Sequence, residues 1–234
     1  KSKIYKIIAV IGLVGIIGSS IYYYTLPNRH KAIVKGFLLE KLGIVEKDWK
    51  VTSKEKIYKM ISPTFYIDGI YKSMEGPKSS KYVQLSQKKE LLFLTSFEVK
   101  ALDAKTFQPV TNNFICHTNV DFNDISYYTN LGLKNRIGTQ YPRMTSLSHG
   151  MEKFSFPSGY GLPMMGNDIL NVTSQSLNHN QKNANFWIKH EVSIGYTKSK
   201  NTKPLMARTA FIMLPYNKQD PFKSPLDPAS NQCI

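Results

Sequence analysis

The feature that most constrains the fold is an uncharged, apolar stretch near the beginning of the sequence. From Ile7 to Tyr24 the chain contains no charged residue, and basic residues flank the stretch on both sides. About 20 predominantly apolar residues are enough for a helix to cross the hydrocarbon core of a bilayer. The pattern therefore predicts an N-terminal transmembrane or signal helix within residues 1–25.

Two interpretations of this helix stay open. A cleaved signal peptide usually has a shorter apolar region that ends at small residues, and Gly18-Ser19-Ser20 offers such a site. The length of the stretch and the tyrosines at positions 22–24 favour a retained anchor, because tyrosine rings settle at the lipid-water boundary. Both interpretations predict export across the inner membrane to the periplasm or cell envelope, since the richness in Lys, Asn, Ser and Ile is typical of bacteria.

The formal net charge of +15 raises the question of nucleic-acid binding. Proteins that bind DNA or RNA concentrate basic residues on one face and interleave aromatic or base-reading side chains. Here the lysines occur singly along the chain, and no recognised binding motif accompanies them. We therefore expect no nucleic-acid partner. Anionic lipid, cell-wall polymer or an acidic protein would be attracted by the same charge.

Residues 26–64 are predicted to form a basic linker that contains one short amphipathic helix. Pro27 ends the apolar helix, and residues 32–46 then have apolar side chains at helical spacing. These side chains form a stripe that needs a partner surface. They are Ile33, Phe37, Leu38 and Leu42.

From about residue 66 the pattern changes to β-rich runs separated by Gly, Pro, Asn and Asp turns. Such runs predict a mainly β protein, with an antiparallel, jelly-roll-like β-sandwich over residues 65–215 and a Pro-rich extended tail at 216–234. The predicted strands cover residues 82–85, 91–100, 114–122, 152–156, 169–177, 186–196 and 206–214.

Four segments follow one another in an order that indicates a family. They are NFICH at 113–117, FSFPSGYGLP at 154–163, a strand that ends at Asn180, and VSIGYT at 192–197. This order resembles the N-terminal domain of the copper type II, ascorbate-dependent monooxygenases, the peptidylglycine-hydroxylating and dopamine-hydroxylating enzymes. The resemblance implies the sandwich fold over residues 65–215. The glycines and prolines of the second segment serve backbone geometry, so they carry no chemistry.

The same resemblance implies a degenerate copper site. The family's His-His pair falls on Cys116-His117 or on His117-Thr118, and its third histidine falls on Leu177. Only His117 is retained. His179 lies an even number of residues beyond Leu177, on the same strand face, so Cys116, His117 and His179 are candidates for a rearranged copper site.

The family's second copper site has no counterpart. It uses a His-x-His pair and a methionine, and no His-x-His occurs among the five histidines of this chain. No nucleophile elbow, phosphate-binding loop or zinc spacing is present either. Ser148-His149-Gly150 is interpreted as a turn, and Asp121 and Asp124 are expected to cap turns. Cys116 is able to pair with Cys233 in an exported protein or to stay buried and unpaired.

Two functions from different classes follow. The first is a noncatalytic cell-envelope protein without a cofactor, which acts as a structural or interaction subunit of a membrane-associated assembly with other envelope proteins. A bacterial, Legionella-like type IV secretion system is the analogous assembly. The alternative is a copper-binding protein or a reduced copper-dependent monooxygenase. The noncatalytic function is favoured. The monooxygenase family uses two copper sites, and this sequence supplies ligands for at most one rearranged site.

Overall fold

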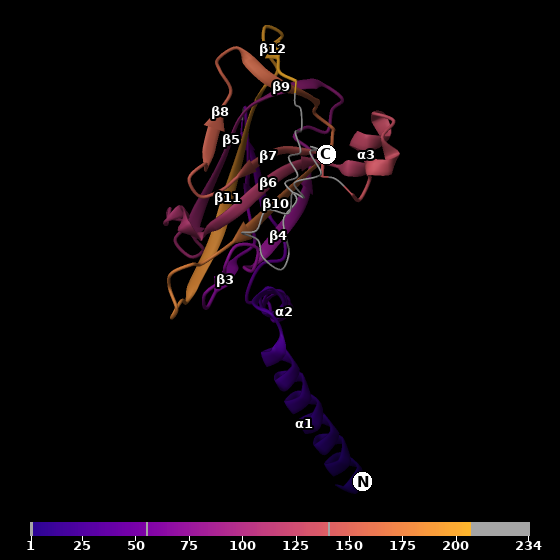
Figure 1. Ribbon diagram of the computed structural model, residues 1–234, viewed down its shortest axis with the longest axis vertical. Helices are drawn as coiled ribbons and strands as arrows, with labels where there is room; N and C mark the ends of the chain where they lie inside the picture. The colour runs from indigo at the N-terminus through magenta and orange to yellow at the C-terminus, as the bar shows by residue number, and fades with distance from the viewer. Residues whose placement is uncertain (1, 55, 140, 207–234) are drawn as a thin grey trace, which may run out of the picture.

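The structure of the protein is a computed structural model that describes residues 2–54, 56–139 and 141–206 (Figure 1). Two helices open the chain, and most of the remaining elements are strands. The helices are α1 (Ser2–Thr25), α2 (Asn28–Lys41) and α3 (Asp124–Asn130), with short 3-10 helices η1 (Asn112–Phe114) and η2 (Lys134–Arg136). The strands are β1 (Lys50–Lys54), β2 (Ile57–Ile61), β3 (Phe65–Ile67), β4 (Lys78–Val83), β5 (Leu91–Asp103), β6 (Ile115–Phe122), β7 (Arg143–Leu147), β8 (Lys153–Ser155), β9 (Tyr160–Met165), β10 (Leu170–Ser176), β11 (Phe186–Thr197) and β12 (Lys203–Pro204).

Helix α1 confirms the predicted apolar helix. Its segment Tyr5–Thr25 has a mean hydropathy of 1.9 and none of it is buried against the rest of the protein, so it is long and apolar enough to cross a membrane. A signal sequence has the same properties, so both interpretations remain. The helix points away from the sheets in Figure 1. Pro27 separates it from α2, because the residue before a proline is disfavoured in helical conformation.

The strands form two sheets. The larger has the order β1-β2-β11-β5-β9-β12, with β3 beside β11 and β8 beside β5, and the smaller has the order β4-β10-β6-β7. All pairs are antiparallel except the two-residue pair of β12 with β9. The long central strands β5 and β11 pair from Asp103 and Ile188 to Phe93 and Thr197. The prediction of a mainly β, antiparallel protein is therefore confirmed.

Both sheets contribute to one buried apolar cluster. Phe97 and Ile194 come from the larger sheet, and Val120 and Val172 from the smaller. Each is 1% exposed or less. At about 25 cal/mol per Å² of apolar surface removed from water, this cluster is the main source of stability.

The β-structure begins earlier than the sequence pattern predicted. Strands β1 and β2 lie inside the segment interpreted as a linker, and β2 pairs with β11 from Ile57 to Ile61. Tyr58 and Met60 alternate inward while Lys59 points out, and this alternation is too short to be noticed among the surrounding lysines. Helix α2 ends at Lys41, because Gly43 follows with a φ of +70°.

The predicted turn before β9 is confirmed. Gly159 has a φ of +80°, and the Tyr160 N–H donates to the Pro157 carbonyl at 3.0 Å. A glycine at that position of a turn avoids the strain that a side chain would bring. The predicted strand at 206–214, apart from Met206, and the predicted tail at 216–234 lie outside the described residues.

Candidate functional site

The structure brings two of the three copper candidates together. Cys116 and His117 follow each other on β6, and the Cys116 Sγ lies 3.3 Å from the His117 Nδ1. Adjacent strand residues normally point to opposite faces. Here the pairing with β10 shifts between His117 and Ile115, so Cys116 is the extra residue of a β-bulge. The bulge turns both side chains toward the same region.

The surroundings of His117 oppose a bound cation. Burial lowers the pKa of His117, and the nearby Arg143 and Lys78 lower it further. The imidazole is thus neutral at pH 7, as a metal ligand must be. The same two cations repel a metal ion, however, and Cys116 has Ser73 as its other polar neighbour at 3.7 Å.

His179 does not join this pair. Strand β10 ends at Ser176, and residues beyond it form a bridge and a bend, so the expected even spacing from Leu177 along a strand does not apply. The His179 side chain is exposed. Within residues 2–54, 56–139 and 141–206, no group of three or more His, Cys, Asp or Glu side chains is placed to hold a metal ion. Cys233 lies outside these residues, so its pairing with Cys116 stays a prediction.

We expect the purified protein to retain far less than one copper ion per chain after reconstitution with Cu(I) under reducing conditions. Two neighbouring ligands beside two positive charges bind a soft metal weakly. Copper measured by atomic absorption, with His117→Ala as the control, checks this. Stoichiometric copper that His117→Ala removes would establish a copper site instead.

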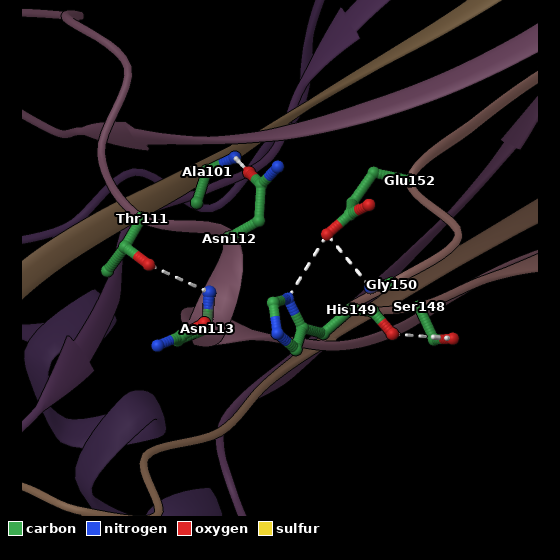
Figure 2. A network of polar contacts seen from close by, with 8 residues as sticks. All are labelled: Ala101, Thr111, Asn112, Asn113, Ser148, His149, Gly150 and Glu152. Carbon is green, nitrogen blue, oxygen red and sulfur yellow. Dashed lines mark hydrogen bonds and ion pairs between the residues drawn. The ribbon is translucent and has the colours of Figure 1, made fainter.

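The Ser148-His149-Gly150 segment is a turn, as predicted. Figure 2 shows the His149 ring directed at Glu152, with 3.1 Å between Nδ1 and Oε1, while the Gly150 N–H donates to the same oxygen at 2.9 Å. The Ser148 hydroxyl instead reaches the carbonyl of His149 at 3.5 Å. A serine becomes nucleophilic beside a positioned base, and this serine lacks that contact.

Asp121 and Asp124 have structural partners. Asp121 is buried on β6 and accepts a hydrogen bond from the Arg143 Nε at 2.8 Å. Asp124 opens α3, where it accepts from the N–H groups of Ile125 and Gly138. Carboxylates in the first turn of a helix stabilise its N-terminus. The cap of α3 is Asn123, whose side chain accepts from the Ser126 N–H, so neither aspartate is the helix cap and Asp121 instead pairs with Arg143.

The polar contacts that sequence reasoning missed join α2 to the sheets. Lys35 on α2 forms an ion pair with Asp68, and its Nζ lies 3.0 Å from the Tyr71 hydroxyl, which donates to Asp68 at 2.6 Å. Burial alone would lower the pKa of Lys35, but its bonds to Asp68 and Tyr71 raise it above the ordinary value. Burial and the bond to Asp68 raise the pKa of Tyr71 to about 12. At neutral pH the cluster therefore holds an ammonium, a carboxylate and a neutral phenol.

A second contact holds the chain just after α2. The Lys189 side chain on β11 is 2% exposed, and its Nζ lies 2.8 Å from the Glu46 Oε1. The other Glu46 oxygen accepts from the Thr64 hydroxyl at 2.9 Å. Burial of Glu46 favours a higher pKa, but the bonds from Lys189, the backbone and Thr64, with the charge of Lys189, together outweigh burial and lower the pKa to about 2. Together, Lys35–Asp68–Tyr71 and Glu46–Lys189 are called the α2 contacts below.

A buried histidine connects the two sheets. His190 on β11 is fully buried, and its Nδ1 lies 2.7 Å from the Ser174 Oγ on β10, which also contacts the Thr118 hydroxyl. Burial lowers the pKa of His190 to about 3, and the nearby His117 acts in the same direction. The backbone of Phe114 lies close enough to raise the pKa of His190, which opposes part of the effect of burial. The His190 Nε2 itself has no hydrogen-bond partner among the described residues. His190 and Ser174 are both fully buried, so a substrate cannot reach them. Their contact is part of the packing between the two sheets.

One signal in the sequence pointed to these residues. Lys189 and His190 stand side by side in a strand whose neighbours are mostly apolar. Because successive side chains point to opposite faces, one of the two faces the core and the other faces whatever covers the outside of the sheet. The identity of the covering residue, Glu46, is visible only in the structure.

No family model, no curated protein and no solved structure matches this chain.

Proposed function

We propose that the protein is a noncatalytic, membrane-anchored subunit of the cell envelope that works by protein-protein contact. In this proposal α1 is the anchor and the two sheets form an exported scaffold. The charge of the chain is strongly positive. His190 is buried, Asp121 and His149 have structural partners, and His179 lies away from Cys116 and His117.

The observation that carries the proposal is the pair of α2 contacts. They hold α2 against the sheets directly after the apolar helix, so an anchored α1 would present the β-structure in one fixed orientation. A flexible linker is enough to keep an enzyme near a membrane. A fixed orientation is what a subunit needs when it fits neighbours in an assembly.

We also infer that the two sheets form a sandwich of the jelly-roll kind. The chain passes from the smaller sheet to the larger and back through β4, β5 and β6, and from the larger to the smaller and back through β9, β10 and β11. The contact of His190 with Ser174 and the shared apolar cluster support two sheets packed face to face. A large envelope assembly is the proposed setting, and a type IV secretion complex is the first to test on the analogy drawn from the sequence.

Extraction of the full chain from membranes with a mild detergent is expected to yield a large assembly on size-exclusion chromatography. Asp68→Asn breaks the ion pair with Lys35 while conserving side-chain size, so it should stay in the membrane fraction and lose much of the large species. Asp48→Asn is the matched control, because its carboxylate is 80% exposed and lies 3.9 Å from Lys81. A clean monomer for the unsubstituted protein under the same extraction would contradict the proposal.

A further inference from the structure

Helix α2 has two faces of different character. Its inner side carries Ala32, which is buried, and Lys35, which pairs with Asp68. Elsewhere on the helix Ile33, Phe37 and Leu38 are 53%, 55% and 51% exposed, although Ile33 and Phe37 also border a cavity of about 380 Å³ between α2 and the β-structure around Phe65. This is the stripe that the sequence predicted to need a partner surface. The β-structure leaves more than half of each of these three side chains exposed.

The exposed apolar residues stand among basic ones. Arg29, His30 and Lys41 are exposed on the same helix, and Glu40 is its one acidic residue. Ile33, Phe37 and Leu38 together with Arg29, His30 and Lys41 are called the outer face of α2 below. Leu42 and Ile44 continue its apolar part just beyond the helix, at 71% and 55% exposure. Apolar side chains bordered by lysine and arginine are typical of helices that lie in the interface of an anionic membrane.

The chain order places the outer face close to a bilayer. Helix α1 ends at Thr25 and α2 begins at Asn28. Figure 1 shows α2 at the junction of α1 and the sheets, running across the direction of α1 rather than continuing it. A helix that follows a membrane-spanning helix in this way starts at the level of the lipid headgroups and runs along the membrane surface.

We propose that the outer face of α2 binds the headgroup region of an anionic lipid membrane. The apolar side chains enter the boundary with the acyl chains, and the basic side chains meet lipid phosphates. The α2 contacts on the inner side then fix the sheets relative to the membrane surface. This inference rests on the proposed retention of α1 as an anchor.

The test uses the full chain in vesicles of phosphatidylglycerol and phosphatidylethanolamine. Cys116→Ser and Cys233→Ser remove the native thiols, and single cysteines are then introduced as Gly15→Cys, Phe37→Cys or Ile125→Cys for a nitroxide label. A cysteine side chain at position 15 meets no atom within 4 Å. Ile125 is the matched control, an apolar residue that is 60% exposed on α3, which lies away from α1 in Figure 1. Electron paramagnetic resonance compares collisions with oxygen, which dissolves in lipid, and with a water-soluble nickel complex.

We expect the label at position 37 to collide with nickel several-fold less than the label at position 125, and with oxygen more. Neutral phosphatidylcholine vesicles should reduce this difference, because their headgroups carry no net negative charge to attract the basic residues. An unchanged difference would overturn the role of anionic lipid. If the label at position 15 is protected from nickel while the label at position 37 is fully accessible to it, this inference is overturned. The proposal that α1 is an anchor would then still stand. Nickel access at position 15 would overturn the anchor and the inference together. Protection at position 37 from both reagents would assign the face to a protein partner and overturn the lipid proposal.

Discussion

Acidification from pH 7 to pH 5 is expected to lower the free energy of unfolding by about 2 kcal/mol through His190. Burial lowers the pKa of this histidine in the folded protein from 6.5 to about 3. Below pH 6.5 the unfolded chain therefore takes up a proton that the folded chain refuses until the pH reaches about 3. Stability is lost as the pH falls through that window. Urea unfolding followed by circular dichroism, at several pH values between 7 and 5, measures the effect.

The variant His190→Asn should flatten this pH dependence. Asparagine offers a polar group to Ser174 and does not titrate. We expect the variant to have a lower free energy of unfolding at pH 7, because the imidazole ring is lost from the core. Its free energy of unfolding should fall less between pH 7 and pH 5 than that of the unsubstituted protein. His149→Asn is the control, because the His149 side chain is 59% exposed. Its pH dependence should match that of the unsubstituted protein. If the free energy of unfolding of His190→Asn falls with pH as steeply as that of the unsubstituted protein, another group causes the pH dependence.

Glu46→Gln is expected to destabilise the protein by about 3 kcal/mol, the lower end for a broken buried ion pair. The Lys189 side chain is 2% exposed, and the substitution leaves its ammonium without the Glu46 counter-charge. The lower end applies because the Glu46 side chain is 41% exposed and water reaches it. The loss should be visible as a lower urea midpoint at pH 7.

A double variant separates the ion pair from general damage. Glu46→Gln with Lys189→Met removes both charges, so it should recover much of the stability that Glu46→Gln loses. Lys59→Met removes a similar pair, Lys59 with Glu191, but the lysine is 43% exposed and the cost should stay below about 1 kcal/mol. Equal losses in Lys59→Met and Glu46→Gln would contradict the burial argument.

The same pair predicts a second loss at lower pH. Burial raises the pKa of Glu46, but the bonds from Lys189, the backbone and Thr64, with the charge of Lys189, together lower it from 4.5 to about 2. Its stabilising effect is therefore complete above pH 4.5 and disappears as the pH falls toward 2. His190 acts alone between pH 6.5 and 4.5, and the two windows overlap from pH 4.5 to about 3. The variants His190→Asn and Glu46→Gln therefore assign the two losses.

The sequence by itself determined what depends on neighbours along the chain. The apolar stretch from Ile7 to Tyr24 specified a helix by length, the long strands followed from their composition, and Pro157-Ser158-Gly159 specified a turn by backbone preference. Short elements such as β1, β2 and α3 escaped prediction, because a few residues show too little periodicity against a lysine-rich background.

Only the tertiary structure decided which side chains meet. It bends the chain away from β10 before His179, so the copper candidates are not gathered, and it joins Cys116 to His117 through a β-bulge. It also buries Lys189 against Glu46 and leaves the apolar side chains of the outer face of α2 more than half exposed. Contacts of this kind join residues far apart in the chain, and their cost or benefit depends on burial. Local patterns specify elements, whereas desolvation and pairing between distant segments decide what each side chain does.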